Sequence, residues 1–179
     1  MLNDHQRLMN VFALSGEVTG RKKLQKMIYI AKKLGFPFQE KFEFHFYGPY
    51  SEELSLRVEE LCNFGFLDEK KEDKGGYSQY KYKMTTAGSE FLKEYDTEVP
   101  NLKECLFSMN EQNARFLELV STVLYFEQDS REEVEGKIQT LKPKQGYTSE
   151  EIEEAYQYIA MLRKTKNSYN TSEISSFQS

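Results

Sequence analysis

The segment from residue 23 to residue 88 changes its hydrophobic period several times, and this order limits the folds open to the chain. It begins with a basic stretch, KLQKMIYIAKKLG, in which apolar residues recur at helical spacing. An alternating stretch, FEFHFY, and a second helical stretch, LSLRVEELCNFGFL, follow. Two alternating runs around a Gly-Gly loop then predict a β-hairpin, and TTAG after them predicts another helix start. This order is typical of a winged helix-turn-helix.

Further helices are expected on both sides of this segment. Apolar residues at helical spacing predict one helix over residues 4 to 15 and a longer helical stretch over residues 102 to 126. Two patterns with a hydroxyl residue followed three positions later by Glu, at Ser130 and at Thr148, fit capping boxes. They predict two more helices, the last of which ends near residue 162.

The fold class that we expect is α+β and mostly helical. A winged helix-turn-helix with a β-hairpin wing is predicted for residues 1–98, and a C-terminal helical extension packed on it for residues 99–165. Residues 166–179 are rich in Ser, Asn and Thr and lack an apolar period, which predicts a disordered tail.

Length and composition indicate a compact protein of the cytoplasm. With 179 residues, of which 39% are hydrophobic, the chain can form one compact domain with a helical extension, or two small units that share a core. It contains no run of about 18 apolar residues that would span a membrane. Its first residues, MLNDHQ, lack the charged and apolar regions of a signal peptide. We therefore expect a cytoplasmic location and no membrane association.

The sequence lacks the familiar motifs of catalysis, cofactor binding and metal binding. GxGxxG, P-loop, HExxH and GxSxG patterns do not occur. Cys62 and Cys105 have neither CxxC spacing nor a neighbouring histidine, so we expect both thiols to be reduced and buried. The protein is therefore expected not to be an enzyme, and to use no cofactor and no metal ion.

Charge is distributed unevenly along this chain, whose formal net charge is -5. Residues 19 to 34 carry basic side chains and no acidic one. In a helix, Lys22, Lys26 and Lys33 fall on the side opposite the apolar residues, where they can touch phosphates together with Lys81 and Lys83 of the hairpin. The overall acidity argues against nucleic acid, because phosphate-binding proteins usually carry a basic excess.

The helix in the position of a recognition helix is acidic. Ser51 is its expected N-cap, Glu52 and Glu53 follow in the first turn, and Glu59 and Glu60 come later, against the single basic residue Arg57. A helix that enters the major groove normally presents basic or amide side chains, and carboxylates near phosphates repel. This helix therefore favours a protein partner.

Two motifs of the chain resemble the Panacea domain, also called the SocA-like domain. They are KLQKMIYIA at residues 23 to 31 and FYGPYSEEL at residues 46 to 54, with Leu61-x-x-x-Gly65-Phe66-Leu67 after them. The whole chain, including Leu141-Lys142-Pro143-Lys144 and the helix expected after Tyr147, is similar to the bacterial YwgA family, small proteins without an assigned activity. The Panacea resemblance implies a non-catalytic antitoxin that binds and neutralises a toxin, and one relative delivers its toxin to a protease.

We expect from these observations an antitoxin-like protein-interaction module or a regulatory adaptor. Two candidate residues, Tyr47 and Tyr50, also have a purely structural explanation, in which they pack the Gly48-Pro49 turn before the acidic helix. The alternative is a winged-helix transcriptional regulator that binds DNA, with a homodimer through residues 102 to 126. The candidate partner-binding residues are Tyr29, Tyr47, Tyr50, Glu52, Glu53 and Arg57, and the candidate nucleic-acid-binding residues are Lys22, Lys26, Lys33, Lys81 and Lys83.

Overall fold

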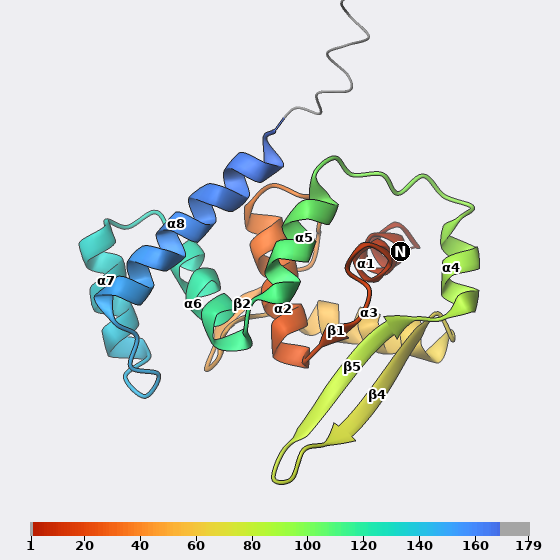
Figure 1. Cartoon of the computed structure of the whole chain (residues 1–179), viewed down its shortest axis with the longest axis horizontal. Coiled ribbons are helices and arrows are strands. Elements are labelled where there is room, and N and C mark those ends of the chain that lie inside the picture. The colour runs from red at the N-terminus through yellow and green to blue at the C-terminus, as the bar shows by residue number, and fades with distance from the viewer. Residues whose placement is uncertain (1, 169–179) are drawn as a thin grey trace, which may run out of the picture.

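The computed structural model describes residues 2 to 168, which form an α+β, mostly helical fold (Figure 1). Eight helices and two small antiparallel sheets occur in these residues. None of these helices combines the length and the hydrophobicity that crossing a membrane requires. The elements in chain order are α1 Leu2–Ser15, β1 Val18–Thr19, α2 Arg21–Lys33, β2 Glu43–His45, β3 Gly48–Tyr50, α3 Glu52–Asn63, β4 Leu67–Asp73, β5 Ser78–Met84, α4 Thr86–Leu92, α5 Leu102–Glu111, α6 Ala114–Tyr125, α7 Arg131–Leu141 and α8 Ser149–Lys166.

The larger sheet contains the predicted β-hairpin, which we call the long hairpin. Its strands β4 and β5 pair from Leu67 with Met84 to Asp73 with Ser78, and the hairpin projects from the helical body (Figure 1). The sheet has the order β1-β5-β4, because Val18 of β1 pairs with Tyr82. The hairpin prediction is confirmed. Strand β1 was not predicted, since two residues carry no period of their own.

A second, short hairpin joins α2 to α3 and consists of β2 and β3. Phe44 pairs with Pro49, and His45 pairs with Gly48. The alternating stretch FEFHFY predicted one strand, whereas the chain turns back after His45 and forms β3 from Gly48, which adopts φ +90°, a conformation that glycine tolerates. The short hairpin presents residues 46 and 47 at its tip.

Local capping explains why most predicted helices begin where they do. The hydroxyl of Ser51 accepts a hydrogen bond from Leu54 N–H, and Thr148 with Glu151 forms the predicted capping box. The predicted helical stretch over residues 102 to 126 is helical, but it is divided into α5 and α6. Asn113 accepts from the N–H of Phe116 and starts α6 after the extended residue Gln112.

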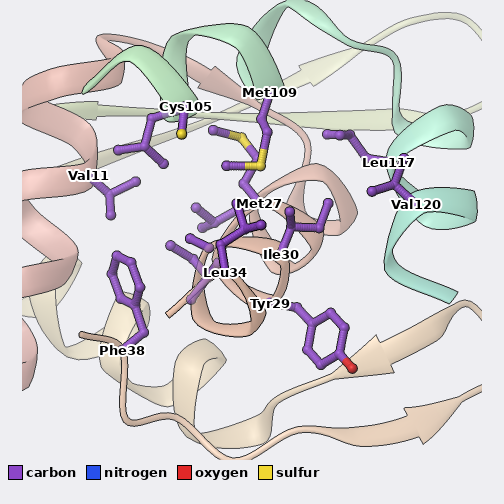
Figure 2. Packing of buried hydrophobic residues seen from close by; sticks show 14 of the residues in the cluster. Val11, Met27, Tyr29, Ile30, Leu34, Phe38, Cys105, Met109, Leu117 and Val120 are labelled. Atoms are coloured by element: carbon purple, nitrogen blue, oxygen red, sulfur yellow. The ribbon is translucent and has the colours of Figure 1, made fainter. Parts of the chain in front are cut away.

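Helices α2 and α6 lie at the centre of the molecule and pack against each other. The side chains of α2 are buried without interruption from Leu24 to Ala31, and those of α6 from Leu119 to Leu124. Figure 2 shows side chains of α2 facing those of α5 and α6, with Met27 close to Met109. One hydrophobic cluster extends from α1 to α8, while the predicted division at residue 98 stays a prediction.

The end of the chain differs in part from expectation. Helix α8 continues to Lys166, beyond the predicted end near residue 162 and into the first position of the predicted tail. Asn167 is the C-cap of α8, and residues 169 to 179 of the predicted tail lie outside the described residues.

Candidate functional site

A cleft of about 780 Å³ opens between α2, α3 and the two hairpins. Its apolar floor includes the buried side chains of Leu24, Leu54 and Val58. Positions 54, 55, 58, 59, 62 and 63 share one face of α3, so the cleft follows this helix along almost its whole length. The short hairpin borders the cleft, and Glu69 and Tyr82 border it from the long hairpin.

The rim of the cleft carries exposed aromatic side chains at the tip of the short hairpin. Phe46 is 71% exposed and Tyr47 is 46% exposed, and their rings meet edge to face with centroids 5.0 Å apart. The ammonium group of Lys22 lies 3.3 Å from the centroid of the Tyr47 ring, in a cation–π contact. A large apolar side chain that is held at the mouth of a cleft is typical of a binding surface.

The backbone of the short hairpin is held by buried ammonium groups. Lys26 Nζ donates a hydrogen bond to the carbonyl oxygen of Pro49 at 2.7 Å. Lys142 Nζ donates to the carbonyl oxygen of Phe46 at 2.5 Å and pairs with Glu118 Oε1 at 2.9 Å. These charge-assisted bonds fix both sides of the turn, because each lysine is itself immobilised by the core.

Lys26 does not lie on an exposed side of α2, as we expected, but is only 2% exposed. Burial lowers the pKa of Lys26 to about 8; Glu118 opposes this shift, and the charges of Lys142 and Lys22 add to it. The helical spacing correctly places the lysines on one side of α2. At Lys26, however, the short hairpin and α6 pack over this side and bury it. Lys26 therefore supports the turn and cannot touch a phosphate backbone.

The two motifs that carry the family resemblance contact each other. Gln25 Nε2 donates to the carbonyl oxygen of Ser51 at 2.9 Å, and Gln25 Oε1 accepts from the N–H of Ser51 at 2.9 Å. The hydroxyl groups of Tyr50 and Ser55 lie 2.9 Å apart. Gln25 satisfies the buried backbone of Ser51 as a neighbouring strand would, which joins α2 to the start of α3. Tyr50 thus packs the turn and also lines the cleft.

Two other candidate partner-binding residues are occupied inside the molecule. Tyr29 is 5% exposed and meets Phe42 edge to face with centroids 5.1 Å apart. Burial raises the pKa of Tyr29, which keeps its hydroxyl protonated. Arg57 forms ion pairs with Asp4 at 3.2 Å, with Glu40 at 2.9 Å and with the half-buried Glu53 at 3.3 Å. Among the acidic candidates, Glu52 is exposed.

The candidate nucleic-acid-binding lysines do not form one continuous surface. Lys22 and Lys33 are exposed but lie eleven positions apart on α2, about 16 Å at the rise of a helix, with the buried Lys26 between them. On the long hairpin, Lys81 pairs with Glu72 at 3.3 Å, and Lys83 is exposed. The structure therefore places only Lys22 of this set beside the cleft, apart from the buried Lys26.

The cysteines of the described chain are free thiols. Cys105 is buried and Cys62 is half-buried at the edge of the cleft. Burial raises the pKa of each thiol to about 11, so both stay protonated near neutral pH. Within residues 2 to 168, no group of three His, Cys, Asp or Glu side chains is placed to hold a metal ion.

Sequence reasoning missed several residues that build the site, namely Gln25, Phe46, Glu118 and Lys142. The sequence contains one indication of the role of Glu118, because it is the only acidic residue in the apolar stretch ARFLELVSTVLY. A lone charge on such a helix usually has a buried partner. Lys142 lies in a segment that carries the YwgA resemblance, but no pattern around it indicated that it is buried.

The comparisons with known proteins give one clear relative. No family model matches the chain, so the resemblance to the Panacea domain stays a prediction. The uncharacterized protein YwgA of Bacillus subtilis (strain 168) is 60% identical over 163 residues, which cover 91% of this chain and 98% of that protein. An identity of this size over nearly the full length of both chains establishes common ancestry, and the chain belongs to the YwgA family.

Proposed function

We propose that the protein is a non-catalytic, winged-helix protein-interaction module, an antitoxin-like protein or a regulatory adaptor of the cytoplasm, that binds a partner protein at the cleft. The observation that carries this proposal is the exposure of Phe46 beside a cleft of about 780 Å³. Phe46 lies in the turn of the short hairpin, whose backbone is held by Lys26 and Lys142, so this turn loses little conformational entropy when a partner docks.

The arrangement of elements supports the winged-helix assignment. Helices α2 and α3 follow one another through the short hairpin, and the long hairpin comes directly after α3. Strand β1 adds a third strand to the long hairpin, beside the start of α2. The resemblance of residues 23 to 31 and 46 to 54 to the Panacea domain supports an antitoxin-like role.

Charge favours a protein over DNA as the partner. Glu52 and Glu59 are exposed on α3, where a recognition helix would meet the phosphate backbone. Of the lysines that would balance them, Lys26 is buried and Lys81 is paired with Glu72. The alternative, a DNA-binding regulator, would depend on Lys22, Lys33 and Lys83 alone, which would give weak and strongly salt-dependent binding.

Residues 102 to 126 leave little exposed apolar surface from which a homodimer interface could form. Most apolar side chains of α6 are buried against α2 and α8. Phe107 and Tyr125 are exposed at 58% and 40%. The proposed partner site does not require a second copy, because the cleft is formed by one chain.

The experiment is affinity capture of the tagged protein from its native cell, with and without nuclease. We expect a stoichiometric protein that survives nuclease and is lost from the Phe46→Ala/Tyr47→Ala variant. The matched control is Tyr77→Ala, which removes an equally exposed aromatic side chain, 65% exposed, from the tip of the long hairpin. Discrete DNA fragments that disappear from the Lys22→Glu variant, without such a protein, would favour the regulator instead.

A further inference from the structure

We infer that the cleft binds a linear segment of the partner in which an acidic side chain contacts Lys22, a basic side chain contacts Glu59, and an apolar side chain enters between them. This inference rests on the proposed function and names the chemistry of the partner. It is carried by two opposite charges that the cleft leaves without ionic partners, one on each helical wall.

Lys22 and Glu59 differ in this respect from the other exposed charges of the cleft. Lys22 is exposed, and its described contact is the Tyr47 ring, which is neutral. Glu59 is exposed on α3 and forms no ion pair with any residue from 2 to 168. Arg21 and Glu69, in contrast, approach each other to 3.5 Å. Lys22 and Glu59 are therefore available to a ligand, whereas Arg21 and Glu69 neutralise each other.

The electrostatics around Lys22 favour an incoming carboxylate. The ammonium groups of Lys26 and Lys142 are buried nearby, and the repulsion from Lys22 and Lys142 contributes to the lowered pKa of Lys26. Glu118 is the one carboxylate that pairs with Lys142 there. A second carboxylate at Lys22 would reduce this excess of positive charge.

The floor of the cleft that Lys22 and Glu59 both line is apolar. Leu24, Leu54 and Val58 are buried beneath the cleft, and the half-buried Tyr50 stands at one side. The α3 wall from Leu54 to Asn63 is about 14 Å long at the rise of a helix. A wall of this length suits about four extended residues, so one short segment that lies along α3 has room for an acidic, an apolar and a basic side chain.

The experiment is selection of random 12-residue peptides on phage against the full-length protein, followed by affinity measurement of the selected peptides. We expect enriched peptides to carry an acidic and a basic residue on either side of an apolar one. Lys22→Glu should weaken their binding about tenfold, because attraction becomes repulsion. Peptides with Lys in place of the acid should regain affinity for this variant. Lys103→Glu, an equal charge change on an exposed residue of α5, should leave binding unchanged.

Two results would overturn the inference. Enriched peptides without charge preference, or peptides whose affinity does not respond to Lys22→Glu, would show that the cleft selects apolar character alone. If no selected peptide binds more weakly to the Phe46→Ala variant than to the native protein, a linear segment is excluded as the ligand of the cleft. Neither result decides the proposed function, because a folded protein partner captured from the cell, and lost with Phe46 and Tyr47, would still support it.

Discussion

The two hairpins of this protein are stabilised in opposite ways. The long hairpin pairs seven residues on each strand, and its charged side chains pair with one another, as Glu72 does with Lys74 at 3.1 Å and Lys81 at 3.3 Å. The short hairpin pairs three residues on each strand, and Lys26 and Lys142 hold its backbone from the core. The long hairpin therefore depends on its own ladder, and the short one on residues distant in sequence.

This difference separates a solvated surface from a candidate contact surface. Charged side chains along β4, an edge strand, protect the long hairpin against pairing with other chains. The short hairpin exposes Phe46, and the two buried lysines, Lys26 and Lys142, hold the backbone of its turn. Buried ammonium groups are costly, so a turn with no function would be stabilised more simply by apolar contacts.

The largest effect is expected for Lys142→Ala. The substitution leaves the carboxylate of Glu118 and the carbonyl of Phe46 without their buried partner. We expect a loss of about 3 kcal/mol in the free energy of unfolding, measured by urea titration. Lys144→Ala, which removes an exposed lysine two positions away, is the control and should change little. Equal effects of both substitutions would show that Lys142 does not hold the short hairpin.

The second prediction compares glycines of the two hairpins. Gly48 has φ +90°, outside the left-handed region that other residues reach, and its added Cβ would lie 3.6 Å from Lys26 Nζ. Gly75 of the long hairpin has φ +72° and open space around it. We expect Gly48→Ala to cost about 2 kcal/mol and Gly75→Ala about 1 kcal/mol in thermal unfolding. The reverse order would contradict the tighter constraint on the short hairpin.

The third prediction uses the pKa of about 8 for Lys26, which is lower than the 10.5 of a free lysine. The unfolded chain therefore binds this proton more tightly than the folded one, and stability rises as pH increases between these two values. From pH 7 to pH 9, the free energy of unfolding of the native protein should gain about 1 kcal/mol over that of Lys26→Met.

The difference between the two proteins is the quantity to measure, because it removes shared contributions. Both contain Cys62 and Cys105, whose raised pKa values lower stability above pH 9, where the unfolded thiols ionise. A difference that stays constant from pH 7 to pH 9 would mean that Lys26 is not buried as a charged group.

The smallest effect is expected for Glu72→Gln on the long hairpin. Hydrogen bonds from Lys74 and Lys81 lower the pKa of Glu72, but this half-buried carboxylate lies on the surface of the hairpin, where water reaches and screens its ion pairs. The unfolding transition should therefore not move beyond experimental error at neutral pH. A shift as large as that of Lys142→Ala would remove the contrast between the two hairpins.

Features of the fold that depend on neighbouring residues were predictable from the sequence. Ser51 and Thr148 start helices because their hydroxyl groups bond to backbone three positions away. The break at Gln112 was missed, since the apolar period continues across it and only the Asn113 cap interrupts the helix. Strand β1 was missed because Val18 is extended only through pairing with Tyr82.

The site was less predictable, because its main contacts join distant segments. Tyr47 and Tyr50 were found through their motif, and both line the cleft. Lys26 was expected at the surface, because a sequence shows the side of a helix but not what covers it. Arg57 was expected to meet a partner, whereas Asp4 and Glu40 from other parts of the chain surround it.

The most direct test of the contact surface is photo-crosslinking in living cells from each hairpin tip. A photoreactive phenylalanine analogue would replace Phe46 in one variant and Tyr77 in another, two aromatic residues with similar exposure of 71% and 65%. We predict a single crosslinked partner protein from position 46, which the Lys142→Ala substitution weakens, and none from position 77. Crosslinks to protein or DNA from position 77, with none from position 46, would contradict the assignment of the short hairpin as the binding surface.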